Sequence, residues 1–279
     1  MESSPKTLQC GTKALDLSRP RIMGILNVTP DSFSDGGRFL ALDKALEHAE
    51  TMLAAGADIL DVGGESTRPG AADVSEQQEL DRIVPVIEAI NTRFDTIVSL
   101  DTSKAAVIRE GAVAGAGLIN DVRALREPDA LAAVVKAQLP VCLMHMQGQP
   151  RSMQQAPEYS DVLAEVTQFL TDRRQVCIDA GIPASQIVID PGFGFGKSLE
   201  HNLTLLKGLE TLCGNAPVLI GLSRKRMFAS ILNNDSVSRV VASVTAAMLC
   251  VQRGASIVRV HDVEETAHAL AVFRAVDEL

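Results

Sequence analysis

The sequence predicts an α/β fold, a single (β/α)8 TIM barrel that spans residues 1–279, with an N-terminal hairpin closing the bottom of the barrel. Short apolar segments alternate with longer amphipathic segments along the chain, and its 279 residues are close to the length of about 250 residues usual for such barrels. The apolar segments are rich in Val, Ile and Leu with little polar alternation, as is typical of strands buried on both faces of a parallel sheet. We expect strands at 21–28, 59–62, 96–100, 118–122, 140–144, 187–189, 218–222 and 257–260.

Each expected strand is followed by an amphipathic segment, and this repeated pairing indicates a closed barrel more than an open sheet. The first such segment ends at Gly56, which can cap a helix. The second opens at Ser75 with Ser-Glu-Gln-Gln-Glu, an N-cap signature. Residues 8–20 precede the first strand and are expected to form the hairpin. We expect helices at 43–55, 75–94, 104–114, 128–138, 161–180, 199–213, 238–253 and 263–276.

Composition and charge narrow the possible partners and location. The net charge of −9 argues against broad nucleic-acid binding, which needs a basic surface. No stretch approaches the roughly 20 apolar residues of a membrane span. The five cysteines form no C-x-x-C pair, so a disulfide framework or zinc site is not expected. We therefore expect a soluble cytoplasmic protein with no nucleic-acid or membrane partner.

Two connections are longer than packing requires, at 29–42 after the first expected strand and at 63–74 after the second. Long glycine-bearing loops at the carboxyl ends of barrel strands are where catalytic lids are expected.

Polar residues stand where the apolar runs stop, and in a barrel these positions converge on one mouth. Arg259 and His261 are two residues apart on one strand, so their side chains point the same way and suit an oxyanion such as phosphate. A single residue of this kind can instead be a hydrogen-bonded loop anchor. The strand-end residues are Asn27, Asp61, Asp101, Asn120, His145, Asp190, Arg259 and His261.

Three consecutive cations, Arg224, Lys225 and Arg226, follow the seventh expected strand. Many barrels bind phosphate after strands 7 and 8, beside the N-terminus of a short helix. The cations could serve an anion, a carbonyl oxygen or only solvent.

Long motifs in order along nearly the whole chain, from about residue 8 to about residue 275, resemble those of the dihydropteroate synthases, a family of pterin-binding barrels. The motifs are ILNVTPDSFSDGG at 25–37, DVGGESTRPG at 61–70, DT at 101–102, ND at 120–121, MHM at 144–146, DPGFGFGK at 190–197, SRK at 223–225 and RVHD at 259–262. The resemblance implies condensation of 6-hydroxymethyl-7,8-dihydropterin pyrophosphate with p-aminobenzoate, which gives 7,8-dihydropteroate and pyrophosphate in folate biosynthesis. It also implies competition by sulfonamides, which mimic p-aminobenzoate.

The resemblance further implies a role for each matching residue. The pterin would lie in the barrel mouth, with Arg259 stacked on the ring and Asp190 accepting the two adjacent donors of the 2-amino and N3–H edge. The expected pterin-binding residues are Asp101, Asn120, Val122, Met144, Asp190, Phe195, Lys225 and Arg259, with Val122, Met144 and Phe195 as apolar walls.

The second half of the expected site binds the pyrophosphate and p-aminobenzoate. The pyrophosphate would meet Asn27, Arg68, Arg259 and His261, with Mg²⁺ as cofactor held partly by Asn27. The p-aminobenzoate would contact Phe33, Ser34, Thr67, Pro69, Phe195 and Arg226. The residues expected to act in catalysis are Asp35, Arg68, Lys225, Arg259 and His261.

One position departs from the family pattern, because Arg226 stands where the family usually has Ser. Its guanidinium could bind the p-aminobenzoate carboxylate directly, or it could turn into solvent and leave the carboxylate to backbone N–H groups.

The expected mechanism is departure of pyrophosphate before attack by the arylamine, because the pterin ring can delocalise positive charge on the methylene carbon. The resemblance also implies a homodimer formed through the last helices. Two alternatives stay open. A pterin-binding methyltransferase barrel would pass a methyl group to a corrinoid partner, and a non-catalytic pterin-binding subunit would bind without turnover.

Overall fold

The computed structural model describes residues 6–28, 38–65, 74–148, 157–214 and 216–277. Eight parallel strands form one sheet in the order β8-β7-β6-β5-β4-β3-β10-β9, and a parallel bridge between Ile189 and Val218 closes β8 onto β9. The predicted TIM barrel is therefore confirmed. Its strands are β3 (Arg21–Asn27), β4 (Ile59–Gly63), β5 (Ile97–Asp101), β6 (Leu118–Asp121), β7 (Val141–Met144), β8 (Ile187–Asp190), β9 (Leu219–Ile220) and β10 (Ile257–Val260).

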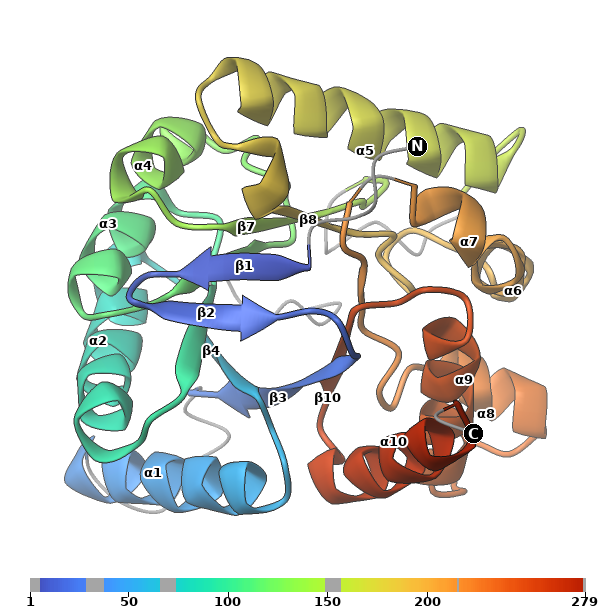
Figure 1. The fold of residues 1–279 in the computed structure, drawn as a ribbon, viewed down its shortest axis with the longest axis horizontal. Coiled ribbons are helices and arrows are strands. Elements are labelled where there is room, and N and C mark those ends of the chain that lie inside the picture. Colours follow the sequence, from blue (N-terminus) through green and yellow to red (C-terminus); the bar gives the residue numbers. More distant parts are fainter. Residues whose placement is uncertain (1–5, 29–37, 66–73, 149–156, 215, 278–279) are drawn as a thin grey trace.

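Helices surround the sheet on its outer face (Figure 1). The predicted N-cap of the second helix is present, and it forms a capping box: the Ser75 side chain accepts the N–H of Gln78 while the Gln78 side chain accepts the N–H of Ser75. The helices are α1 (Arg38–Ala54), α2 (Glu76–Arg93), α3 (Ala105–Val113), α4 (Ala130–Ala137), α5 (Val162–Asp179), α6 (Leu199–Lys207), α7 (Leu209–Leu212), α8 (Met227–Leu232), α9 (Val240–Val251) and α10 (Val263–Asp277), with a 3-10 turn η2 (Ala184–Gln186) before β8.

The helix predicted at 199–213 is divided in two at Gly208. A Cβ placed on Gly208 would lie 2.6 Å from Cδ2 of Leu163, so the backbone here passes too close to α5 for a larger residue. This close approach between helices is set by tertiary packing, which the amphipathic pattern of one segment does not report.

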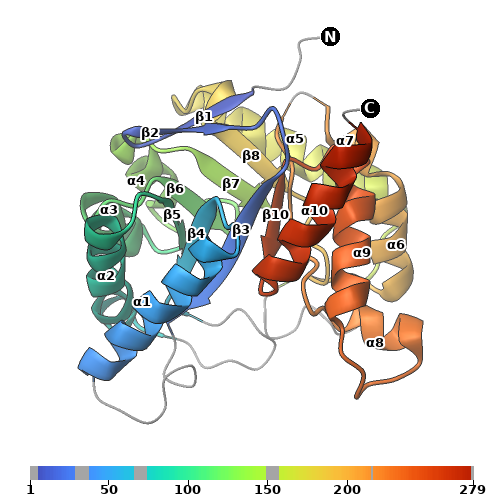
Figure 2. The same ribbon diagram turned by 60° about the horizontal axis from the view of Figure 1, so that its bottom comes forward.

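The N-terminal residues close the bottom of the barrel, as predicted. Strands β1 (Thr7–Cys10) and β2 (Lys13–Asp16) form an antiparallel hairpin that crosses one end of the sheet, opposite to α8 (Figure 2). Leu8, Cys10 and Leu15 project into a buried apolar cluster with the inward-facing residues near the starts of the strands. Those residues are Met23, Ile59, Ile97, Leu118, Cys142, Val188, Leu219 and Ile257. The carboxyl ends of the strands are therefore the open mouth.

Within the described part of the chain, no helix is both long and apolar enough to cross a membrane.

Candidate active site

The strand-end side chains meet at the mouth of the barrel, and Arg259 lies at their centre. Its Nε donates to Oδ2 of Asp61 at 2.6 Å, and its Nη2 donates to Oδ2 of Asp101 at 2.7 Å. Asp61 also accepts the hydroxyl of Ser99 at 2.6 Å and the side-chain amide of Asn120 at 3.1 Å. Strand register explains the cluster, because Asp61 is opposite Ser99 and Asp101 is opposite Asn120.

Burial perturbs the acids of this cluster. It raises the pKa of Asp101 to about 7, with Arg259 opposing the rise and Asp61 adding to it. It also raises the pKa of Asp190 to about 6, although the Gly192 N–H donates to Asp190 Oδ1 at 2.7 Å and the charges of Lys225 and Lys197 oppose the rise. Clustered acids with raised pKa values in a barrel mouth are typical of a functional site.

The pKa values of the two basic side chains of the mouth, Lys225 and Arg259, shift in opposite directions. Burial lowers the pKa of Lys225 to about 8, Arg259 lowers it further, and Asp190 opposes the change. Burial also disfavours the charged form of Arg259, but Asp61 and Asp101 outweigh this effect and raise its pKa. The guanidinium is thus permanently charged and fixed in orientation by two carboxylates.

An apolar wall lines one side of the mouth. Met144 is buried, and Val122 and Phe195 pack with it, together with Met146, which the sequence analysis did not single out. The Lys225 ammonium lies 4.2 Å from the centre of the Phe195 ring, a cation–π contact. A flat heterocycle could therefore lie between apolar side chains and a ring of polar groups.

The expected pyrophosphate residues occupy neighbouring strands. Asn27 ends β3, and His261 directly follows β10, which pairs with β3. The Ser223 hydroxyl lies 3.0 Å from His261 Nδ1 and accepts the His261 backbone N–H at 3.1 Å, so the imidazole is fixed beside the mouth. This brings Asn27, Arg259 and His261 to the same end of the barrel.

Other predicted residues fall outside the described part of the chain. They are Phe33, Ser34, Asp35, Thr67, Arg68 and Pro69.

Of the three consecutive cations, Lys225 is the one that lies beside the polar cluster of the mouth. Arg224 has φ +56° and pairs with Asp262, its Nε donating at 3.1 Å. Lys225 faces Phe195, whereas Arg226 is exposed and stands directly before α8. Arg224 is thus held by an ion pair, Lys225 lies at the mouth and Arg226 lies on the surface.

His145 does not join the mouth, contrary to the expectation for the strand-end residues. Its ring packs edge-on against Phe169 of α5 at 4.9 Å between centroids, because it alternates with the inward-facing Met144 and Met146. Its Nδ1 lies 2.9 Å from the ammonium of buried Lys197. Burial, followed by the charge of Lys197, lowers the pKa of His145 to about 3.

Three residues of the site network were given no role from sequence. Asp61 was recognised only as a strand-end residue, yet it holds Arg259, Ser99 and Asn120. Ser223 orients His261. Lys197 was part of a quoted motif only. The role of Asp61 could have been inferred from its strand position, because it pairs with Ser99 on the neighbouring strand, which also carries Asp101.

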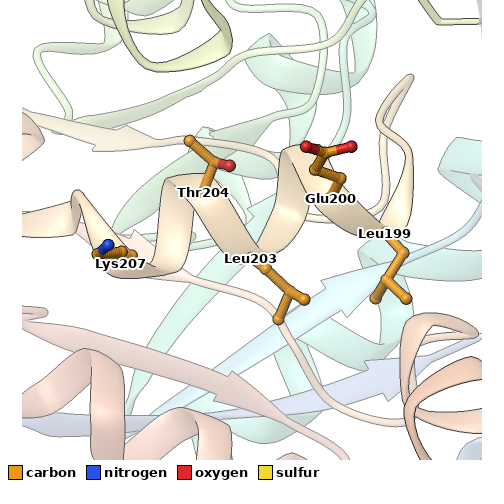
Figure 3. Close-up of a pocket in the computed structure, with 5 residues that line it drawn as sticks. All are labelled: Leu199, Glu200, Leu203, Thr204 and Lys207. Carbon is orange, nitrogen blue, oxygen red and sulfur yellow. The ribbon is translucent and has the colours of Figure 1, made fainter.

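A separate surface hollow lies on α6, lined by Leu199, Glu200, Leu203, Thr204 and Lys207 (Figure 3). All five residues come from one helix on the outer layer, and none belongs to the polar network of the mouth. The hollow is not the candidate active site.

Comparison with known proteins agrees with this geometry. Residues 23–261 match the family described as pterin binding enzyme, so the chain belongs to that family. A dihydropteroate synthase of Haemophilus influenzae is 54% identical over 269 residues, which are 96% of this chain and 98% of that protein.

Two solved structures show the same fold throughout. Dihydropteroate synthase of Xanthomonas albilineans with 4-aminobenzoic acid has a TM-score of 0.93 and 48% identity, covering 99% of this chain and 100% of that one. The Yersinia pestis enzyme in complex with a sulfonamide drug has a TM-score of 0.92 and 54% identity, covering 98% and 100%. The similarity thus points within the family to the dihydropteroate synthases.

Proposed function

We propose that this protein condenses 6-hydroxymethyl-7,8-dihydropterin pyrophosphate with p-aminobenzoate to give 7,8-dihydropteroate and pyrophosphate. The observation that carries the proposal is the cluster of Asp101, Asn120, Asp190 and Arg259 at one barrel mouth, beside the wall formed with Phe195. The relatives named dihydropteroate synthase match this chain over nearly its full length. One of the similar structures contains 4-aminobenzoic acid and another a sulfonamide.

Pterin recognition follows from the donors and acceptors in the mouth. The 2-amino and N3–H edge presents two adjacent donors, and the Asp190 carboxylate can accept both while Oδ1 still accepts the Gly192 N–H. Lys225 donates to the pterin carbonyl oxygen or ring nitrogen. Asp101 and Asn120 offer further polar contacts, and the flat Arg259 guanidinium covers the ring plane.

The reaction breaks the bond between the methylene carbon and the pyrophosphate oxygen and forms a bond from that carbon to the arylamine nitrogen. The nitrogen then loses a proton. The pterin ring delocalises charge on the methylene carbon, so pyrophosphate leaves first and no protein nucleophile is required. Arg259 and His261 stabilise the charge that develops on the leaving group.

The residues around Asn27 fit a magnesium ion that is held mainly by phosphate oxygens and water. Asn27 is half-buried, and no hydrogen bond to a described residue engages its side chain, so its amide oxygen is available. Mg²⁺ binds through few protein ligands and keeps several waters. The ion would neutralise charge on the departing pyrophosphate.

The p-aminobenzoate carboxylate is assigned to Arg226, which is exposed directly before α8. An arginine can form two parallel hydrogen bonds with a carboxylate. Phe195 supplies an apolar contact to the aryl ring. Sulfonamides compete at this site as mimics of the arylamine.

We further assign the protein to the cytoplasm and to a homodimer. Cys10, Cys142, Cys177 and Cys250 are buried free thiols, which fits a reducing compartment. The outer face of α9 exposes Val241 and Leu249, and the adjacent α10 exposes Val272 and Val276. Exposed apolar side chains on two neighbouring helices support association through the last helices.

The test is direct formation of dihydropteroate by purified protein, detected by mass, with both substrates and Mg²⁺ present. Omission of either substrate should abolish the product, and a sulfonamide should compete with p-aminobenzoate. Tight pterin binding without product would instead indicate a non-catalytic pterin-binding protein, and methyl transfer to a corrinoid would indicate a methyltransferase.

A further inference from the structure

A buried lysine behind the pterin pocket contacts no side chain proposed to bind substrate, yet it is bonded to the backbone of the loop that follows Asp190 and carries Phe195. Lys197 is 3% exposed and immediately precedes Ser198, the N-cap of α6. Its side chain turns back into residues 191–196, which we call the glycine loop. A lysine is almost never fully buried without a specific set of partners.

The partners of the Lys197 ammonium are backbone carbonyls from two segments. Nζ donates to the carbonyl oxygens of Gly192 at 2.9 Å and Phe195 at 3.0 Å, both in the glycine loop. It also lies 3.4 Å from the carbonyl oxygen of His145 and 2.9 Å from His145 Nδ1, just after β7. One cation therefore fastens the glycine loop to the end of the neighbouring strand.

The glycine loop can approach β7 this closely because of its glycines. Gly192, Gly194 and Gly196 all have positive φ values, +67°, +76° and +62°. A Cβ on Gly192 would lie 1.9 Å from the His145 carbonyl oxygen, and one on Gly196 would lie 2.5 Å from that of Gln147. The loop backbone is thus wound so that its carbonyls face Lys197.

The same two loop residues that bind Lys197 support the pocket on their other side. The Gly192 N–H donates to Asp190 Oδ1 at 2.7 Å, while its carbonyl accepts from Lys197. The Phe195 ring lies 4.2 Å from the Lys225 ammonium, while its carbonyl also accepts from Lys197. Any shift of these two peptide groups would move the supports of both Asp190 and Lys225.

We propose that Lys197 is a positioning residue for the pterin pocket, and that its ammonium, by holding the carbonyls of Gly192 and Phe195, orients Asp190 and Lys225 for the pterin ring. This inference rests on the proposed function. It assigns to Lys197 no contact with substrate, because its nitrogen lies among backbone carbonyls and His145.

The cost of burying the charge of Lys197 agrees with a functional role for this residue. Burial lowers the pKa of Lys197 to about 7, opposed by Asp190 and reinforced by Lys225. A buried charge that disfavours its own protonated form is costly for stability, and an apolar residue of similar volume is often tolerated in its place. The hydrogen bonds of Lys197 to the two loop carbonyls therefore give a reason for a lysine at this position.

The test compares Lys197→Met, which keeps the length and apolar stem but removes the ammonium, with wild type. We expect the dissociation constant for the pterin substrate, measured by calorimetry, to rise by about tenfold or more, since two charge-assisted hydrogen bonds to the loop are lost. The matched control is Lys13→Met at the opposite end of the barrel, where Lys13 donates to the Thr96 carbonyl at 2.6 Å. That variant should bind pterin as wild type does.

A double-mutant cycle with Phe195→Ala separates positioning from a general loss of stability. If Lys197 acts through Phe195, the effects of the two substitutions on pterin affinity should be less than additive. A merely structural role would lower the melting temperature and leave the pterin affinity of the folded protein unchanged. Additive effects, or pterin affinity in Lys197→Met within twofold of wild type, would overturn the inference.

A second variant keeps the test decisive if Lys197→Met does not fold. Lys197→Arg retains the charge, but its planar donors cannot place one nitrogen against both carbonyls in their present positions. We expect weaker pterin binding with an intact fold. Failure of both variants to fold would assign Lys197 to folding alone and overturn the inference. Failure of the proposed function would look different, because wild type itself would then bind no pterin.

Discussion

Asp190 combines a raised pKa with the two carboxylate oxygens that the proposed contact to two adjacent pterin donors requires. Asp190→Asn replaces one acceptor oxygen by an NH₂ group that faces a donor of the pterin. The cost in a buried site is about 1–3 kcal/mol. We expect calorimetry to show pterin affinity that is weaker by about 5- to 160-fold. Asp172→Asn, on the exposed face of α5, is the control, since Asp172 lies far from the mouth and accepts from Gln168. If Asp190→Asn bound the pterin with wild-type affinity, Asp190 would not be a pterin-binding residue.

The raised pKa of Asp190 also sets a direction for the pH dependence. Its carboxylate, the form that accepts two donors, is lost as pH falls through about 6. Pterin affinity should therefore decline below that pH, and the decline should be steeper in wild type than in Asp190→Asn, in which Asp101 still titrates near this range. For folding the sign is opposite. Between the model-peptide pKa near 4 and the folded value of about 6, the folded state binds more protons, so this residue lowers stability as pH rises.

Arg259 is fixed by Asp61 and Asp101 at once, a geometry that a single ammonium cannot reproduce. In Arg259→Lys we expect turnover to fall by about ten- to hundredfold with the fold intact, because at least one charge-assisted hydrogen bond and the stacking plane are lost. Steady-state kinetics check this, with Arg93→Lys as control, because Arg93 pairs with Glu50 on the surface. Unchanged turnover would exclude Arg259 from the reaction.

Arg226 tests the departure from the family pattern. If its guanidinium holds the p-aminobenzoate carboxylate, Arg226→Ala should raise the KM for p-aminobenzoate by at least roughly tenfold and leave that for the pterin substrate nearly unchanged. Sulfonamides lack the full carboxylate charge and should lose less affinity. Kinetics at low salt give the largest effect. An unchanged KM for p-aminobenzoate at low salt would show that Arg226 points into solvent and does not bind the carboxylate.

At the residue scale, the strand-end pattern predicted Asp101, Asn120, Asp190 and Arg259 correctly as neighbours because the carboxyl ends of parallel barrel strands meet. The same pattern was wrong for His145, since its side chain alternates with that of inward-facing Met144 and packs outward against Phe169. Lys197 gave no signal, because a lysine just before a helix N-cap is usually exposed. Its burial depends on how the glycine loop folds back, which no local pattern records.

At the scale of elements, all eight barrel strands and the hairpin could be predicted, because buried apolar runs and their spacing are local features. Helix breaks could not, since the end of α6 depends on contact between Gly208 and Leu163 of another helix. The strand predicted at 218–222 is shortened to Leu219–Ile220, because Val218 forms only an isolated bridge and the chain turns between Leu222 and Lys225.

The hairpin has a testable role as the plug of the barrel. Leu8 is completely buried among strand residues at the bottom. Leu8→Ala should lower the free energy of unfolding by about 2–5 kcal/mol through lost burial and a cavity. Turnover of the folded enzyme should not change, because the mouth lies at the other end. Denaturant unfolding checks this, with Leu203→Ala, 44% exposed on α6, as the control. A Leu8→Ala protein as stable as the control would contradict the plug role.

At the scale of the whole molecule, the exposed apolar face of α9 and α10 predicts self-association. Val241 is 77% exposed on α9, so a charge there would not disturb the core. Val241→Glu should shift the protein from dimer to monomer in sedimentation experiments, because a charge placed in an apolar interface would have to be desolvated. Val113→Glu, on α3 at 85% exposure, should leave the dimer intact. Equal masses for wild type and Val241→Glu would exclude this face as the interface.

The whole barrel brings the polar strand ends and the apolar wall to one mouth, and the central claim is that this mouth releases pyrophosphate in steady turnover only when it joins two substrates. The most direct measurement is pyrophosphate release by wild type and by Arg259→Lys, with each substrate and Mg²⁺ omitted in turn. The account predicts steady release in wild type that requires the pterin substrate, p-aminobenzoate and Mg²⁺ together, and strongly reduced release in the variant. Release at the same rate without p-aminobenzoate, or from Arg259→Lys as fast as from wild type, would contradict it.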